Sequence, residues 1–259
     1  MTSLPFNGSH ALSDALSDVA RRVQQVTVEV KVPRAGGGSG VVWPLPGRAD
    51  SDLIVTNAHV AQTGTVTVVR GDGDVRSATR VAVDPSRDLA VLRTTQPFDR
   101  VATVGSAGAL TAGDLVLAVG APLGVPQALA LGVVHGVLRD DHDVRAVRSD
   151  VKLMPGNSGG PLTDARGHVV GINTLVMQGL GVAVSSETVQ RFLREQDRPR
   201  LGVSVRPVTV RRSTPRRSEA PALLVLDVER ASLAERAGLQ LGDVVLSAGG
   251  RRLDRSESL

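Results

Sequence analysis

The sequence predicts a mainly β protein whose short strands close into a barrel or a sandwich. Apolar residues make up 41% of the 259 residues, and aromatic residues make up only 2%. Valine, alanine and leucine dominate the apolar set, which favours strands around a core of branched aliphatic side chains. Short apolar runs recur at even spacing between turns that contain glycine or proline, a pattern typical of barrels and sandwiches.

The first predicted elements are a helix and a strand. Residues 10–23 carry apolar side chains at helical spacing on one face, with acidic residues off that face, so they predict an amphipathic helix that packs on the first domain. Over residues 26–32 the apolar period changes to two, which predicts a strand. The glycine run 36–40 predicts a hairpin turn, because it lacks the lysine and the serine or threonine that a phosphate-binding loop requires.

Further strands follow with almost no helix between them. They are predicted over residues 53–56, 65–70, 75–83, 89–93, 115–120, 128–138, 161–164, 168–174 and 181–184. A helix follows Ser185, since a serine before an acidic first turn is a typical N-cap. The charged, proline-broken stretch 196–200 is interpreted as a domain linker. Beyond it we predict strands over 201–205, 222–228 and 243–246, with a short helix over 231–236.

Composition excludes several classes of function. The chain has no cysteine, so a thiol nucleophile, a disulfide framework and thiolate metal sites are excluded. The net charge of +4 is modest, and no aromatic residues lie between the arginines of residues 206–217 to stack on bases, which argues against nucleic-acid binding. No apolar run approaches the roughly 18 residues that a membrane span needs.

The N-terminus does not predict a signal peptide. It lacks a basic first segment, and Asp14 and Asp18 interrupt the one candidate apolar stretch. As written, the chain is predicted to stay in the cytoplasm. A periplasmic or extracellular location follows if the true start lies elsewhere.

A glycine-flanked serine is the first candidate catalytic group. In the loop Gly156-Asn157-Ser158-Gly159-Gly160, the absence of Cβ atoms lets the backbone approach a substrate closely. The N–H groups of Gly156 and Ser158 are candidates to converge on one point and stabilise the oxyanion of a tetrahedral intermediate. The same residue types also form ordinary turns.

A serine nucleophile needs a base, and the base needs an orienting acceptor. Of the five histidines, His59 alone follows directly on a buried strand, where the scaffold can hold it. Asp88 stands at the entrance to the apolar strand 89–92, where a carboxylate needs a partner. Taken singly, His59 also suits the role of a surface or core histidine, and Asp88 suits that of a turn aspartate. Their order with Ser158, His then Asp then Ser, is that of the chymotrypsin-type triad.

The nucleophile elbow of α/β-hydrolases is a weaker alternative. The loop matches Gly-x-Ser-x-Gly, but that fold places its acid and then its histidine after the serine. Here His168 is the one histidine after Ser158, and a turn and a strand follow the loop instead of a helix.

Several segments together resemble the HtrA/Deg family of trypsin-like serine proteases, over nearly the whole chain. The catalytic motifs are Thr56-Asn57-Ala58-His59-Val60, Asp88-Leu89-Ala90-Val91-Leu92 and Gly156-Asn157-Ser158-Gly159-Gly160-Pro161-Leu162. The match continues through Gly171-Ile172-Asn173-Thr174 and Gly181-Val182-Ala183-Val184. From Leu201 the chain resembles a PDZ module.

The resemblance implies two six-stranded antiparallel β-barrels of chymotrypsin type followed by a partial PDZ domain, with no metal or cofactor. It divides the chain into an N-terminal helical extension, a protease domain, a linker and the partial PDZ domain, over residues 1–23, 24–195, 196–200 and 201–259. By position, His59 matches the family's base, Asp88 its acid and Ser158 its nucleophile. Gly156 and Ser158 match its oxyanion donors.

The resemblance also assigns two binding surfaces. Leu153, Met177 and Leu180 fall where family members line the S1 pocket, and their apolar character suggests small or medium aliphatic P1 residues; ordinary barrel core is the alternative. The family usually has isoleucine and asparagine where this chain has Leu153-Met154. The carboxylate-binding loop of the PDZ module corresponds to Leu201, Gly202 and Val203. The helix that forms the other wall of the groove comes late in such modules, about where this sequence ends. We therefore expect weak binding of C-terminal peptides.

The resulting functional prediction is a serine endopeptidase that cleaves unfolded or damaged proteins through an acyl-enzyme, in protein quality control. The alternative is a peptide-binding, holdase-like protein with secondary protease activity, which has no need of the complete triad. Unfolded polypeptides are the expected partners. Family members often form trimers through N-terminal aromatic residues, for which this chain offers Phe6 and Trp43.

Overall fold

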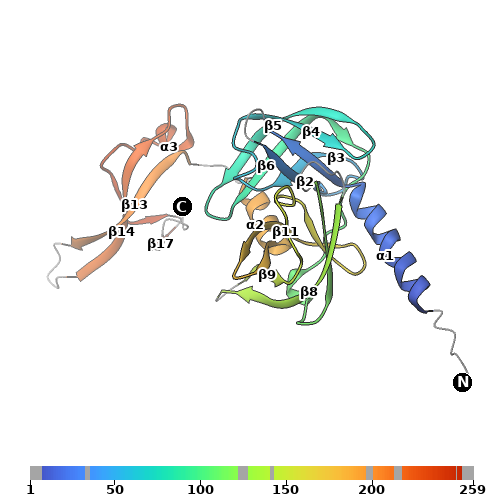
Figure 1. The fold of residues 1–259 in the computed structure, drawn as a ribbon. Coiled ribbons are helices and arrows are strands. Elements are labelled where there is room, and N and C mark those ends of the chain that lie inside the picture. Colours follow the sequence, from blue (N-terminus) through green and yellow to red (C-terminus); the bar gives the residue numbers. More distant parts are fainter. Residues whose placement is uncertain are drawn as a thin grey trace, which may run out of the picture. The chain divides into compact units, whose positions relative to one another are not determined.

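The chain divides into two compact units, Met1–Gln196 and Asp197–Leu259. Within them, the computed structural model describes residues 8–32, 36–121, 128–140, 143–196, 201–212, 218–248 and 250–252. The first unit contains two closed barrels of six antiparallel strands each, drawn in Figure 1. This confirms the mainly β, chymotrypsin-like architecture that the family resemblance implied.

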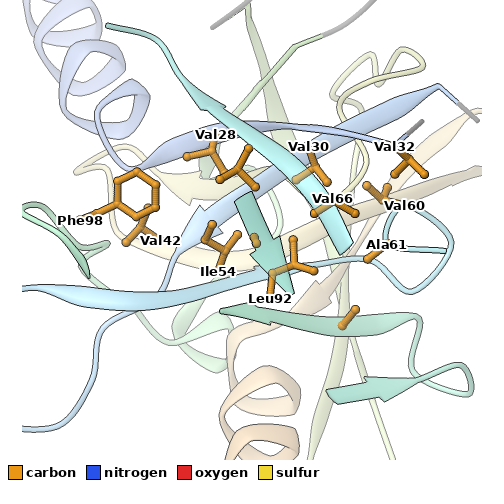
Figure 2. Close-up of a cluster of buried hydrophobic side chains, with 13 residues drawn as sticks. Val28, Val30, Val32, Val42, Ile54, Val60, Ala61, Val66, Leu92 and Phe98 are labelled. Carbon is orange, nitrogen blue, oxygen red and sulfur yellow. The ribbon is translucent and has the colours of Figure 1, made fainter. Parts of the chain in front are cut away.

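The first barrel closes in the strand order β1-β2-β3-β6-β5-β4. Its strands are β1 (Thr27–Lys31), β2 (Gly37–Val42), β3 (Ser51–Thr56), β4 (Thr65–Arg70), β5 (Val75–Asp84) and β6 (Leu89–Phe98). Figure 2 shows its interior, where side chains such as Val28, Ile54 and Leu92 gather with Phe98 at one end. Branched aliphatic residues fill this core, as the composition predicts.

The prediction of a hairpin turn over the glycine run 36–40 is wrong for most of that run. Residues 37–42 form β2, which pairs with β1 from Lys31↔Gly37 to Thr27↔Val41. Glycine is required at these positions because a side chain would clash with its neighbours. A Cβ on Gly38 would lie 2.7 Å from the Ser158 carbonyl oxygen, and one on Gly40 would lie 2.6 Å from Ile54 Cγ2. Gly38 thus marks a close approach of the Ser158 loop from the second barrel, and Gly40 marks close packing inside the first barrel.

The second barrel closes in the order β10-β11-β12-β9-β8-β7. Its strands are β7 (Leu115–Gly120), β8 (Ala128–Arg139), β9 (Val144–Ser149), β10 (Pro161–Asp164), β11 (Val169–Met177) and β12 (Leu180–Ser185), with a 3-10 turn, η1 (Ala107–Ala109), before them. Sequence reasoning missed β9. Arg145 and Arg148 interrupt its short apolar run, so it carries too little apolar periodicity to be recognised.

Two helices flank the barrels. Helix α1 (Gly8–Gln24) packs Val19 and Val23 against β7, and its N-terminal half projects beyond the barrels in Figure 1. Helix α2 (Ser186–Gln196) inserts Phe192 into a core cluster that joins both barrels. None of the helices within the described ranges is long and apolar enough to span a bilayer.

The core between the barrels also contains Trp43, which is 3% exposed. A tryptophan buried in this way is not available to contact another copy of the chain. Phe6, the other aromatic residue considered for trimer contacts, lies outside the described residues. Trimer formation therefore stays a prediction from family resemblance.

The described residues of the second unit form a small β structure with one short helix. It comprises β13 (Val203–Arg212), β14 (Ser218–Val228), α3 (Leu233–Arg236), β15 (Val244–Val245), β16 (Ser247–Ala248) and β17 (Arg251–Arg252). The hairpin β13–β14 is longer than predicted from sequence. Leu223 and Val225 are buried, whereas Leu241 is 75% exposed. Its assignment as a partial PDZ domain stays a prediction.

Candidate active site

His59 projects from a one-turn segment directly after β3. The N–H groups of Val60 and Ala61 donate to the Asn57 carbonyl at 3.2 and 3.1 Å, which closes the turn. Arg80 Nη1 donates to the Ala61 carbonyl at 2.7 Å and ties the end of the turn to β5. The turn is thus held at both ends, and the His59 side chain remains 49% exposed.

Asp88 occupies a left-handed backbone conformation, with φ = 54°, immediately before β6. Such a φ is costly for a residue with a side chain and is found where the surroundings hold it in place. The Asn57 amide does so from one side, since its Nδ2 donates to the Asp88 carbonyl at 2.9 Å. From the other side, the Asp84 carboxylate caps the preceding turn by accepting from the N–H groups of Ser86 and Arg87, at 2.9 and 3.1 Å.

The Asp88 carboxylate binds His59 through two groups. His59 Nδ1 lies 2.8 Å from Asp88 Oδ2 and 3.0 Å from Oδ1, and the His59 backbone N–H donates to Oδ1 at 3.1 Å. The hydroxyl of Thr174, on β11 of the second barrel, donates to Oδ2. Because an ionised carboxylate only accepts hydrogen bonds, Nδ1 carries the proton in the neutral form of His59, which leaves Nε2 with its lone pair, as a general base requires.

The loop around Ser158 has its peptide groups fixed by backbone hydrogen bonds. Asn157 N donates to the Met154 carbonyl at 2.9 Å, and Gly160 N donates to the Asn157 carbonyl at 3.0 Å. Gly156, with φ = 101°, adopts a conformation that suits glycine alone. The N–H groups of Gly156 and Ser158 have no acceptor among the described residues, so both are open to an incoming oxygen.

The Ser158 hydroxyl donates to the Thr174 carbonyl at 3.0 Å. Within the described part of the chain, no hydrogen bond joins Ser158 to His59. Thr174 nevertheless brings the candidates together, because its carbonyl binds Ser158 and its hydroxyl binds Asp88. Catalysis requires the Ser158 hydroxyl to leave this carbonyl and turn to His59 Nε2.

Residues 38–172 match the family of the trypsin-like peptidase domain. The serine protease HhoB of Synechocystis sp., described as putative, is 32% identical over 83% of this chain and 57% of its own length. Protease Do-like 1 of Arabidopsis thaliana chloroplasts is 30% identical over 94% of this chain and 61% of its own length. A solved HtrA-type protease, AlgW with a tripeptide, superposes with a TM-score of 0.63 at 27% identity, over 93% of this chain and 85% of that one.

This chain belongs to the HtrA family of trypsin-like serine proteases. It spans about three fifths of the length of the two curated relatives named above.

The residues assigned to the S1 pocket of this HtrA-family chain lie close to one another. Met177 and Leu180 are direct partners in the β11–β12 hairpin, so their side chains share one face. Leu153 lies against the neighbouring Gly181, where a Cβ would come within 3.2 Å of Leu153 Cδ1. Met177 is 44% exposed, which does not suit the alternative of ordinary barrel core. Their role in binding P1 stays a prediction.

The predicted carboxylate-binding loop is held against α3 and the turn before it. The Leu201 carbonyl accepts from Ala234 N at 2.7 Å, and the Gly202 carbonyl accepts from Glu229 N at 2.8 Å. Gly202 has φ = 70°, and a Cβ there would lie 2.4 Å from Ser232 Cβ, so glycine is required. Its function, with Val203, in binding a peptide carboxylate stays a prediction.

Sequence reasoning missed the groups that hold the candidate triad. Asn57 and Thr174 lie inside quoted motifs, yet nothing in their spacing indicates that both bind Asp88. Asp84 carried a usable signal, because an aspartate followed by proline and serine is typical of a capped turn.

The described residues include no group of three or more His, Cys, Asp or Glu side chains placed to hold a metal ion.

We expect Asp84→Asn to destabilise the protein near neutral pH by about 1 kcal/mol. Burial acts to raise the pKa of Asp84, but hydrogen bonds from Ser86 and Arg87 and the charge of Arg87 outweigh it, so the pKa is lowered. A carboxylate with a lowered pKa stabilises the fold above its ordinary value of about 4, and this contribution is lost as the pH falls through the lower value.

The measurement is denaturant unfolding of both proteins at pH 7 and pH 3. The difference between them should shrink at the lower pH. An equal difference at both pH values would mean that the carboxylate charge of Asp84 does not matter.

Proposed function

We propose that this chain is a serine endopeptidase that cleaves unfolded or damaged polypeptides through an acyl-enzyme, in protein quality control. The observation that carries the proposal is the His59–Asp88 pair, in which His59 Nδ1 lies 2.8 Å from the carboxylate. Thr174 connects this pair to Ser158, because its hydroxyl donates to Asp88 and its carbonyl accepts from Ser158. A binding protein or holdase has no need of this pair or of the two open N–H groups. The peptide-binding alternative is therefore the weaker proposal.

In the proposed mechanism, His59 Nε2 takes the hydroxyl proton as Ser158 Oγ attacks the scissile carbonyl. The N–H groups of Gly156 and Ser158 stabilise the resulting oxyanion. The imidazolium, stabilised by Asp88, then gives its proton to the leaving amine, and an acyl-enzyme remains on Ser158. Water activated by His59 attacks this ester, and the proton returns to Ser158 as the acid product leaves.

The location of the chain, its unfolded polypeptide partners and its assembly into a trimer stay proposals as well. Relatives from Chlamydia pneumoniae and Chlamydia trachomatis are described as probable periplasmic serine endoproteases, which supports a periplasmic location. A cytoplasmic location rests on the sequence of the N-terminus alone.

The proposed substrate class is tested with one protein in two states. A native globular protein and its reduced, alkylated, unfolded form are incubated with wild type and with Ser158→Ala. Wild type should degrade the unfolded form alone, and the variant should degrade neither form. Equal cleavage of the native form would contradict the preference for unfolded chains, and no cleavage by wild type would contradict the endopeptidase proposal.

We expect cleavage after Val, Ala, Ile or Leu and rejection of Lys and Arg at P1. The proposed pocket is apolar, and a cation buried without a partner is costly. Arg148 adds to this, because its Nη2 lies 3.5 Å from Met177 Sδ, where it would repel a basic P1 side chain. Mass spectrometry of the cleavage products decides the matter. A majority of cuts after basic residues would refute the pocket assignment.

A further inference from the structure

Ser39, on β2 of the first barrel, is a fully buried serine that lies against the loop of Ser158. Its exposed fraction is 0%. The approach is close, because a Cβ on Gly159 would lie 2.1 Å from the Ser39 carbonyl oxygen and one on Gly160 would lie 3.1 Å from Ser39 Cβ. A polar group so deeply buried needs every hydrogen bond satisfied.

Ser39 makes two hydrogen bonds to the loop, one through its side chain and one through its backbone. Its Oγ donates to the Gly156 carbonyl at 2.7 Å. Its N–H donates to the Ser158 carbonyl at 2.8 Å. The Oγ also accepts from Ala121 N at 3.0 Å, so its single proton is directed to Gly156.

These bonds act on the two residues that carry the open N–H groups. Glycine populates many backbone conformations, so Gly156 does not fix the direction of its own peptide groups. The peptide group between Gly156 and Asn157 is held at both ends, because Ser39 Oγ binds its carbonyl and the Met154 carbonyl binds its N–H. Without the hydroxyl, its carbonyl end loses that partner, and only the bond from Asn157 N to the Met154 carbonyl still holds this peptide group, which adjoins the one that carries the Gly156 N–H.

We propose that Ser39 is a positioning residue for the oxyanion site. Its hydroxyl fixes the Gly156–Asn157 peptide group and its N–H fixes the Ser158–Gly159 peptide group. These adjoin the peptide groups that carry the Gly156 and Ser158 N–H donors, so they limit how far those donors can turn away from the substrate oxygen. Ser39 acts from the first barrel on a site in the second, and it touches neither substrate nor reacting atoms. The inference rests on the proposed serine protease function and adds the residue that keeps the oxyanion site formed.

The test compares Ser39→Ala with wild type by kcat and KM for an unfolded substrate, and by the rate at which a fluorophosphonate modifies Ser158. Deleting an oxyanion donor itself costs about 10² to 10³ in kcat, and loss of the bond that positions it should cost less, on the order of tenfold. We expect kcat and the modification rate to fall together and KM to stay within about twofold, because the oxyanion forms only during reaction.

Ser185→Ala is the matched control. Ser185 is also 0% exposed, its Oγ donates to the Val144 carbonyl at 2.6 Å, and it accepts from Thr188 N at 3.1 Å. Removing its hydroxyl should lower the unfolding temperature as Ser39→Ala does, while kcat per folded molecule stays at the wild-type value. Equal kcat in Ser39→Ala and Ser185→Ala would overturn the proposal and leave Ser39 a purely structural role.

Ser39→Cys covers the case in which the alanine variant does not fold. A thiol fills the space but is a weaker donor, so kcat should lie between those of wild type and Ser39→Ala. A cysteine variant that is as active as wild type would contradict the proposal. Wild-type protein that fails to react at Ser158 would instead overturn the proposed function, and this inference with it.

Discussion

Ser158→Ala is expected to lower kcat on an unfolded substrate by a factor on the order of 10⁶. The variant removes the nucleophile and leaves only the modest rate enhancement that binding and the oxyanion site supply. The structure indicates that this loss of kcat comes from the missing nucleophile and not from a loss of folded protein. Among the described residues, the Ser158 hydroxyl makes one hydrogen bond, to the Thr174 carbonyl, so the fold loses little with it.

The measurement is substrate cleavage beside thermal unfolding of the same samples. Ser77→Ala serves as the control, because Ser77 lies exposed on β5 and should be replaceable without effect. Retention of more than about a thousandth of wild-type kcat by Ser158→Ala would exclude it as the nucleophile.

Asp88→Asn is expected to cost on the order of 10⁴ in kcat, the size found for the same change in a chymotrypsin-type triad. The Asp88 carboxylate accepts hydrogen bonds from three donors: His59 Nδ1, His59 N and the Thr174 hydroxyl. An amide offers one oxygen and two N–H donors, so it favours the tautomer in which Nδ1 is unprotonated. Nε2 then carries the proton and is no longer a base.

A second histidine–aspartate pair supplies the control for Asp88→Asn. His168 Nδ1 lies 3.1 Å from Asp164 Oδ2, and His168 N donates to Asp164 Oδ1 at 2.9 Å, the same arrangement as at His59. Asp164→Asn should therefore lose a comparable contact but keep wild-type kcat. If Asp88→Asn keeps more than about a tenth of wild-type activity, Asp88 is not the acid of the triad.

Local patterns in the sequence predicted strands that close into a barrel or a sandwich and the three candidate catalytic residues, whereas the two six-stranded barrels were implied by the family resemblance. Alternating valines mark strands, and His59, Asp88 and Ser158 each stand in a motif of adjacent residues. Where apolar periodicity was weak, as in β9 with its two arginines, a strand was missed. The helix that begins at Ser186 was found because its cap and its apolar face are both local signals.

The supporting groups were not predictable in this way, because their partners are distant in sequence. Thr174 binds a carboxylate 86 residues away, and Ser39 binds a carbonyl 117 residues away. The glycines of β2 were taken for a turn, since glycine is typical of turns. Their real constraints are the approach of Ile54 within the first barrel and of the Ser158 loop from the second, and these exist only in the folded protein.

The most direct test of the central claim is covalent labelling with a fluorophosphonate followed by peptide mapping. This reagent reacts with a serine whose hydroxyl is activated by a base and whose oxyanion site is formed. We expect one modified residue, Ser158, and loss of modification in His59→Ala, which removes the base. Modification at another serine, or none in folded wild-type protein, would contradict the assignment of this site as the catalytic centre.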